Sequence, residues 1–329
     1  MSALVHEIGS RLARKLARMS AGEDGPTDFI LADAKDADMA GGLSALGVNR
    51  ETGRACTLPE FDAAIGEIVR QDLIDILLAS VSTLERLQSR NQFDNSAVAQ
   101  AVRLNDTSDL WRIRGADYEK QPSVPFATAK LAQCPATLGL YSMTFSGDAC
   151  HDAEALERYR RFREAAQANG VAHFLEVFNP VGSRLDKVDY GPFLNDMVSR
   201  ALAGMQTSER PVFLKLAYNG ASAFEELCRY DPSLVVGIMG GSSGTTRDCL
   251  ELLHQAQNAG ARAALFGRKI LDAEHPPGMV EMMRAVTDRR LSPGEAVDHY
   301  HMMLESRGIV PRRPYATDSE ITEPALLEG

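Results

Sequence analysis

Short apolar segments alternate with amphipathic segments along most of this chain. Helical periodicity appears between the apolar segments, for example over residues 58–71, 152–169 and 190–205. Alternating strands and helices predict a parallel sheet with helical crossovers, and eight strands are the number that closes a (β/α)8 TIM barrel. The predicted strands span residues 29–33, 75–81, 96–104, 137–145, 173–178, 212–217, 234–239 and 263–266.

Two segments flank the predicted barrel, which covers residues 23–309. Residues 4–19 place apolar side chains on one helical stripe and basic ones elsewhere, so residues 1–22 are predicted to form an amphipathic N-terminal helical extension. The favoured interpretation is a helix that packs beneath the barrel or at a subunit contact, and the alternative is a transit peptide or membrane-surface helix. Residues 310–329 show no periodicity and are expected to form an extended tail.

Composition narrows the classes of function. The 329 residues include 45 acidic and 35 basic ones, a formal net charge of −10, which argues against a nucleic-acid partner. The five cysteines are scattered, as expected for reduced thiols in a cytoplasmic protein and not for a disulfide framework or a zinc site. No apolar run approaches the roughly 18–20 residues that span a bilayer, so no membrane partner is expected.

Lys215 is a lone cation within an apolar run that an Asn-Gly turn closes. Strand alternation places it on the same face as Phe213 and Ala217. A lysine on a buried strand face must either pair with a carboxylate or give up its proton. In the second case the neutral amine is a nucleophile that can form a Schiff base.

The last two predicted strands each end in glycine, followed by a polar turn and a helix. Glycines let backbone N–H groups approach an anion, and the helix N-terminus that follows directs partial positive charge at it. Two consecutive turns of this kind match the phosphate site of a (β/α)8 barrel. The candidate residues are Gly240, Gly241 and Ser242 in the first turn, and Gly267 and Arg268 in the second.

Polar side chains also lie near the ends of other predicted strands, where the chemistry of such barrels is concentrated. Glu176 and Lys215, on the fifth and sixth strands, form either a static ion pair or a proton-shuttling pair. Tyr141 is either a general acid or base or a core aromatic residue. Asp33 is either catalytic or a cap for the segment that follows. Residues 106–133 hold no clear element and are expected to cover this end as a lid or wall.

Lys215, the Gly240-Gly241 turn and the Gly-Arg-Lys-Ile segment at 267–270 resemble the class I aldolases of the bacterial and archaeal fructose-bisphosphate type and their tagatose-bisphosphate relatives. The resemblance covers residues 29–305. It implies a metal-independent lyase without a cofactor. Lys215 would attack the carbonyl of a phosphorylated ketose to form an iminium. The iminium draws electrons from the C3–C4 bond, so an aldehyde is released and an enamine remains.

The resemblance also implies roles for the other candidate residues. Glu176 would assist formation and dehydration of the carbinolamine, and Tyr141 or Asp33 would take the proton from the C4 hydroxyl. The expected partners are a phosphorylated ketose or aldehyde and, because the two chain ends offer extra surface, further copies of the chain in a homo-oligomer. The phosphate would be held by Gly240, Gly241, Ser242, Gly267 and Arg268.

Three features depart from the family's pattern. The predicted fourth strand has no lysine where the tagatose group carries a second one, and Lys269 stands where asparagine is common. Ala34 and Lys35 follow Asp33 where relatives have His-Gly or Gln-Arg-Gly after the aspartate, and Lys35 could replace the basic side chain. The alternative functions are a phosphosugar-binding barrel with non-covalent isomerase or acyl-transfer chemistry, and a non-catalytic regulatory barrel.

Overall fold

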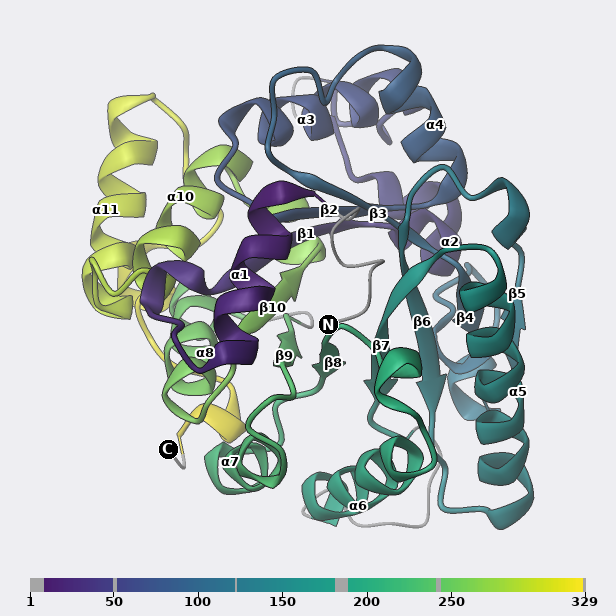
Figure 1. Ribbon diagram of the computed structural model, residues 1–329. Helices are drawn as coiled ribbons and strands as arrows, with labels where there is room; N and C mark the ends of the chain where they lie inside the picture. Colours follow the sequence, from purple (N-terminus) through teal and green to yellow (C-terminus); the bar gives the residue numbers. More distant parts are fainter. Residues whose placement is uncertain (1–8, 50–51, 122, 181–188, 241–243, 328–329) are drawn as a thin grey trace.

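Eight parallel strands close into a barrel in the order β1-β10-β9-β8-β7-β6-β3-β2 (Figure 1), which confirms the predicted (β/α)8 architecture. The computed structural model describes residues 9–49, 52–121, 123–180, 189–240 and 244–327. Every predicted strand segment overlaps one of the eight strands. The strands are β1 (Ile30–Lys35), β2 (Ile76–Ala79), β3 (Ala99–Arg103), β6 (Leu138–Thr144), β7 (Ala172–Phe178), β8 (Leu214–Leu216), β9 (Val236–Met239) and β10 (Ala263–Phe266).

Helices surround the barrel. Helix α3 (Leu58–Gln71) has the predicted bounds, because Thr57 and Glu60 form a capping box at its start. The helices predicted at 152–169 and 190–205 are α5 (Ala149–Ala168) and α6 (Tyr190–Ala203). The other helices outside the chain ends are α2 (Ala37–Gly41), α4 (Val81–Ser89), α7 (Ala221–Tyr230), α8 (Thr246–Asn258), α9 (Arg268–Asp272), α10 (Pro276–Thr287) and α11 (Pro293–Ser306).

Alternate residues along each strand face either the barrel interior or the surrounding helices. On β1, Ile30 and Ala32 belong to the inner apolar cluster, whereas Leu31 packs in the outer cluster with residues of α3. On β7, Phe174 lies inside and Leu175 outside. This alternation decides which polar side chains can enter the barrel and which are held between a strand and a helix.

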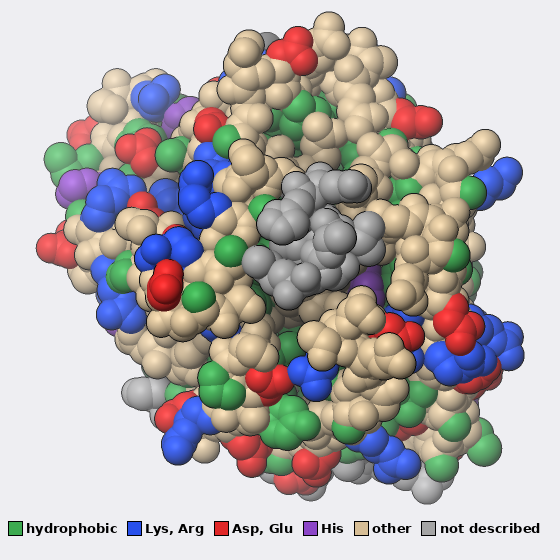
Figure 2. Space-filling model, in the orientation of Figure 1, with side chains coloured by type: hydrophobic (Ala, Val, Ile, Leu, Met, Phe, Trp, Pro, Cys, Tyr) green, Lys and Arg blue, Asp and Glu red, His purple; other side chains and the backbone are tan. Residues whose placement is uncertain are grey.

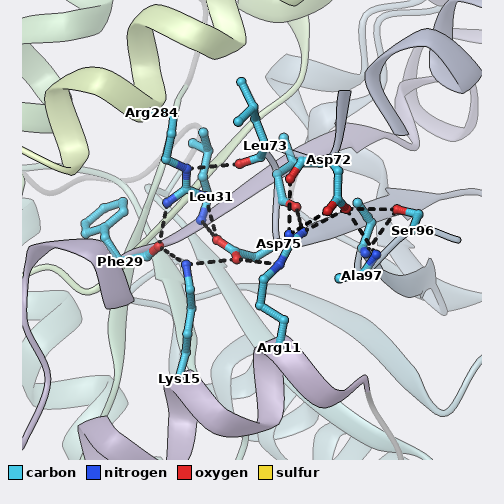
Figure 3. Close-up of polar contacts among 12 residues, drawn as sticks. Arg11, Lys15, Phe29, Leu31, Asp72, Leu73, Asp75, Ser96, Ala97 and Arg284 are labelled. Carbon is cyan, nitrogen blue, oxygen red and sulfur yellow. Dashed lines mark hydrogen bonds and ion pairs between the residues drawn. The ribbon is translucent and has the colours of Figure 1, made fainter. Parts of the chain in front are cut away.

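Helix α1 (Ser10–Ala21) closes the N-terminal end of the barrel, which confirms the predicted packing for the described part of the N-terminal helix. Its apolar stripe, including Leu12 and Leu16, joins the inner cluster. Its basic side chains meet a buried carboxylate beneath the barrel (Figure 3): Lys15 Nζ lies 2.8 Å from Asp75 Oδ1. The network is completed by Arg284, whose NH2 lies 2.7 Å from Asp75 Oδ2, and by Arg11, whose Nε lies 3.3 Å from Oδ1.

The long segment after β3 forms a wall beside the barrel. It contains a two-stranded antiparallel sheet of β4 (Asn105–Thr107) and β5 (Pro125–Ala127). Trp111 packs edge-on against Tyr118 and Phe126, with ring centroids 4.7 and 5.0 Å away. The backbone N–H of Arg112 donates to the carbonyl oxygen of Ala40 at 2.8 Å, which ties this wall to the segment after β1.

The C-terminal segment packs back onto the barrel and is not extended throughout, since it contains the one-turn helix α12 (Tyr315–Asp318). Asp318 Oδ1 accepts a hydrogen bond from the Thr246 N–H at 2.8 Å, and Asp318 Oδ2 lies 3.0 Å from His301 Nε2. Thr322 donates its N–H and hydroxyl to Asp248, both at 2.6 Å. The segment therefore covers the N-terminus of α8.

Figures 1 and 2 view the end that α1 closes, with β4 and β5 behind the barrel. Acidic and basic side chains gather along the right edge in Figure 2, where α5 lies. On α5, Arg158 pairs with Glu154, and Arg160 with Glu157. Such pairs one helical turn apart are typical of a solvated helix face. Over the described residues, the helices are all too short or too polar to cross a lipid bilayer.

Candidate functional site

Lys215, Glu176 and Ser142 lie side by side on the inner face of three neighbouring strands. The ladder pairs Ser142 with Glu176 and Glu176 with Lys215. Lys215 Nζ forms an ion pair with Glu176 Oε1, and the Ser142 hydroxyl donates a 2.7 Å hydrogen bond to Oε2. Lys215 is 6% exposed and Glu176 is 1% exposed. A buried pair of this kind is stable only when its other polar atoms are also satisfied.

Arg103, at the end of β3, completes the network around Glu176. Its NH2 lies 3.4 Å from Glu176 Oε2 and 3.1 Å from Asp106 Oδ1, and its NH1 lies 2.5 Å from Asp36 Oδ2. Burial acts to lower the pKa of Arg103, but the carboxylates of Asp36, Glu176 and Asp106 outweigh burial and raise it overall. Arg103 is therefore a permanent cation beside the Lys215–Glu176 pair, and its NH2 lies 3.1 Å from the Ser142 hydroxyl of β6, a strand without a lysine.

A cavity of about 310 Å³ opens over this network at the C-terminal end of the barrel. Lys215 and Glu176 line it, so the structure brings together the two candidates that the sequence places on neighbouring strands. Phe178, two residues after Glu176, also lines the cavity, as expected for the inner face of β7. From the other strands and their turns, the lining includes Arg103, Asp36, Gly240, Gly267 and Arg268.

Tyr141 does not line this cavity. It lies on the outer face of β6, like Met143, and packs against α5. Its ring centroid is 5.0 Å from that of Tyr159 and 4.4 Å from that of Phe162. Burial raises the pKa of Tyr141 to about 12. The structure thus fits the core-aromatic interpretation and gives no support to Tyr141 as an acid or base.

Asp33 is also outside the cavity, because it shares the outer face of β1 with Leu31. Its carboxylate is fully buried, with Oδ1 2.7 Å from Lys35 Nζ. Burial raises the pKa of Asp33, and the charge of Lys35 opposes that rise. Nor does Asp33 cap a helix, since β1 continues to Lys35 and Asp36 precedes α2. Asp36, which was not among the predicted site residues, lines the cavity instead.

The proposed phosphate turns are placed only in part. Gly240, Gly267 and Arg268 line the cavity, whereas Gly241 and Ser242 lie outside the described residues. Glycine is required at 267, because a Cβ there would clash with the carbonyl oxygen of Ala34 on β1. Arg268 brings a guanidinium into the cavity at the start of α9.

The described residues contain no group of three or more His, Cys, Asp or Glu side chains arranged to hold a metal ion. The groups that meet in the cavity are instead an amine, three carboxylates (Asp36, Glu176 and Asp272) and three guanidiniums. An amine in contact with a carboxylate can exchange a proton with it, and a neutral amine can attack a carbonyl group. Fold and site together define a (β/α)8 barrel with a lysine–carboxylate pair in a cationic cavity.

Comparison with known proteins agrees with this class. Two curated relatives, both named fructose-bisphosphate aldolase class 1 and both from strains of Halobacterium salinarum, are 26% identical over 236 residues. The match covers 71% of this chain and 83% of each relative. It confirms the predicted resemblance to the class I aldolases. No family model matches the chain.

Solved structures show the same fold. A crystal structure of an archaeal fructose 1,6-bisphosphate aldolase matches with a TM-score of 0.62 at 16% identity, covering 84% of this chain and 99% of that one. Another archaeal structure of this enzyme, with its catalytic lysine covalently bound to the carbinolamine intermediate, matches equally well. The fructose-bisphosphate aldolase from Slackia heliotrinireducens gives a TM-score of 0.63 at 14% identity, covering 90% and 93%.

Proposed function

We propose that this protein is a Schiff-base aldolase that cleaves or forms a phosphorylated ketose through an iminium on Lys215. The observation that carries the proposal is the placement of Lys215 Nζ, which lines the cavity in direct contact with Glu176. The sequence similarity to class 1 fructose-bisphosphate aldolases supports the same chemistry. The substrate class, a ketose phosphate, follows from that similarity and from the cationic lining of the cavity.

Glu176 is placed to handle the protons of Schiff-base formation. It takes a proton from the Lys215 ammonium through Oε1, and the neutral amine then attacks the ketose carbonyl carbon. Glu176 returns that proton to the carbinolamine hydroxyl, which leaves as water, and the iminium remains. The iminium has the same positive charge as the ammonium it replaces, so its pairing with Glu176 persists. Arg103 and Ser142 hold the other carboxylate oxygen in position.

Cleavage needs a second base for the proton of the C4 hydroxyl. We assign this role to Asp36, because its side chain lines the cavity while Asp33 and Tyr141 face away from it. As Asp36 takes the proton, the C4 oxygen forms the aldehyde carbonyl. The electrons of the C3–C4 bond move into the enamine on Lys215. Protonation of the enamine and hydrolysis then release the second product and regenerate the amine.

The test is trapping of the covalent intermediate. The protein is incubated with dihydroxyacetone phosphate, reduced with borohydride and digested, and peptides are mapped by mass spectrometry. We expect an adduct on Lys215 that is absent from the Lys215→Met variant. An adduct on another lysine, such as the buried Lys35, would overturn the assignment. If no adduct forms while dihydroxyacetone phosphate still raises the melting temperature, the protein is a phosphosugar-binding barrel or acts non-covalently.

Assembly is a separate part of the proposal. The expected homo-oligomer is tested by light scattering coupled to size-exclusion chromatography, where a mass of one chain, 35.8 kDa, would refute it.

A further inference from the structure

Four cationic side chains line the cavity, and they divide into two pairs. Lys215 and Arg103 both contact Glu176. Arg112 and Arg268, in contrast, form no ion pair and donate no side-chain hydrogen bond to any other residue that the structure describes. Unpaired guanidiniums in a cavity are suited to bind an anionic group of a ligand, because their forked donors match phosphate oxygens.

The backbone after β9 is the expected source of phosphate contacts, but its described donors are engaged elsewhere. The N–H of Gly240 donates to a carbonyl oxygen of β10 at 3.0 Å. The N–H of Thr245 donates to Asp248, and that of Thr246 to Asp318, both at 2.8 Å. The first turn of α8 therefore already faces two carboxylates, which offset the positive end of its dipole. Contacts to a phosphate are therefore sought among the cationic side chains of the cavity.

The two unpaired arginines come from separate elements. Arg268 begins α9, and Arg112 belongs to the wall between β4 and β5, where its backbone N–H is fixed to the Ala40 carbonyl oxygen at 2.8 Å. Burial and the charge of Arg112 lower the pKa of Arg268, whereas Asp272 raises it. Two like charges held near each other repel, and a doubly charged anion between them would replace repulsion by attraction.

The lining from α2 to Gly47 consists mainly of small side chains, which leave room for a compact group. Its one hydroxyl, that of Ser44, donates to the Gly41 carbonyl oxygen at 2.8 Å. The other residues of this stretch are Ala37, Ala40, Gly41, Ala45 and Gly47.

We propose that Arg112 and Arg268 together bind the phosphate monoester of the substrate, so that Arg112 is a specificity-determining residue supplied by the wall between β4 and β5. The identity of the substrate rests on the proposed function, but the anion site does not. Charge-assisted guanidinium–phosphate contacts are strong enough that losing one arginine should weaken binding of the phosphorylated ligand about tenfold or more.

The first experiment compares borohydride trapping with dihydroxyacetone phosphate and with unphosphorylated dihydroxyacetone. In Arg112→Ala and Arg268→Ala, the half-saturating concentration of the phosphorylated ketose should rise about tenfold or more, while that of dihydroxyacetone changes less than about twofold. Arg114→Ala is the matched control, since Arg114 is exposed like Arg112 and belongs to the same segment but does not line the cavity. If Arg112→Ala behaves like Arg114→Ala, or if it weakens the binding of both ketoses equally, Arg112 does not bind the phosphate.

A second measurement separates this inference from the proposed chemistry. Calorimetric titration of the unreacted proteins with inorganic phosphate reports the anion site without any covalent step. Weaker phosphate binding in Arg112→Ala, together with no wild-type adduct, would support the arginine pair and refute the aldolase. An adduct on Lys215 with unchanged phosphate binding in Arg112→Ala would support the aldolase and refute the arginine pair. Circular dichroism of each variant checks that the fold is intact, and Arg112→Lys should restore binding only in part because it lacks the guanidinium fork.

Discussion

At the residue scale, the site is a chain of alternating charges and not an isolated lysine. Lys215 contacts one oxygen of Glu176, Arg103 contacts the other, and Asp36 pairs with the far side of Arg103. Each charge is buried next to an opposite one, which offsets the cost of removing it from water. A proton can be transferred between Lys215 and Glu176 while Arg103 keeps a constant positive charge.

The structure distinguishes the candidate bases: Asp36 lines the cavity, whereas Asp33 and Tyr141 do not. We expect Asp36→Asn to lower kcat for ketose cleavage about 100-fold or more, because an amide cannot accept the C4 hydroxyl proton. Tyr141→Phe should keep kcat within about threefold, since its hydroxyl lies between β6 and α5. Steady-state cleavage assays on both variants decide between the residues. A large loss in Tyr141→Phe with an intact Asp36→Asn would restore the assignment made from sequence.

Two cavity residues were given no role from the sequence, because their roles depend on residues distant along the chain. Arg103 lies at the end of a predicted strand, but its ion pair with Glu176 appears only in the folded barrel. Arg112 lies near enough to Arg268 for its charge to act on that residue. Asp36 was recoverable, because counting alternate residues from the apolar Ile30 puts 30, 32, 34 and 36 on one side of the chain. The same count would have placed Asp33 on the outer face.

At the element scale, apolar runs in the sequence predict where the strands lie. Which side of a strand faces the barrel interior depends instead on how the strand pairs with its neighbours. All eight strands were predicted, because each is a short apolar run whose burial outweighs local preferences. The orientation of Tyr141 was left open, because β6 is buried on both sides and its sequence alone does not say which face meets α5.

The β7–α5 contact leads to a prediction about pH. His173 is buried on the outer face of β7, with its Nε2 2.7 Å from the Tyr159 hydroxyl. Burial, aided by the charge of Arg163, lowers the pKa of His173 to about 3. The unfolded chain binds this proton near its ordinary pKa of about 6.5, so the folded state loses stability as the pH falls from about 6.5 toward 3.

Replacing the histidine should remove that component. Below pH 6.5, we expect the unfolding free energy of wild type to fall more steeply with decreasing pH than that of His173→Gln, by up to about 1.4 kcal/mol per pH unit. Urea denaturation of both proteins at a series of pH values measures the difference. Glutamine keeps an acceptor for the Tyr159 hydroxyl but does not titrate. The slopes of the two plots of unfolding free energy against pH are compared, and not the absolute stabilities of the two proteins. Parallel pH profiles would show that His173 is protonated in the folded barrel.

The attachment of α1 gives a second prediction at this scale. Asp75 is the shared counter-ion of Arg11, Lys15 and Arg284 (Figure 3). Asp75→Asn leaves these buried cations without their charge partner and should destabilise the fold by about 3–5 kcal/mol. Asp72→Asn is the control. Asp72 also contacts Arg11 but its side chain is 41% exposed, and its loss should cost less than about 1 kcal/mol. Equal urea midpoints for the two variants would show that the buried network is not needed for stability.

At the scale of the whole molecule, charge is distributed unevenly. The chain carries a formal net charge of −10, which repels phosphorylated ligands at long range. Four cationic side chains nevertheless line the cavity, and two of them lack a carboxylate partner among the described residues. Capture of an anion therefore depends on these local guanidiniums, and binding is expected to be specific and without long-range steering.

The C-terminal segment is hydrogen-bonded to the N-terminus of α8 and to α11. Asp318 accepts from Thr246 and pairs with His301, while the carboxylate of Asp248 accepts from Thr322 and the Glu323 N–H. The contacts from the α8 end and from His301 lower the pKa of Asp318, although burial opposes this shift. The three segments proposed from sequence, residues 1–22, 23–309 and 310–329, should therefore unfold together and not separately.

Deletion of residues 311–329 tests this coupling. It removes at least four hydrogen bonds at the start of α8, so we expect a loss of about 2–4 kcal/mol and a melting temperature lower by several degrees. Phosphate affinity should change little, because the arginine pair lies on other elements. Asp318→Asn should give a smaller loss, and only above about pH 4, where the wild-type carboxylate is ionised in both states. An unchanged melting temperature on deletion would mean that the segment only rests on the barrel. A large loss of phosphate binding would return the anion site to the end of α8.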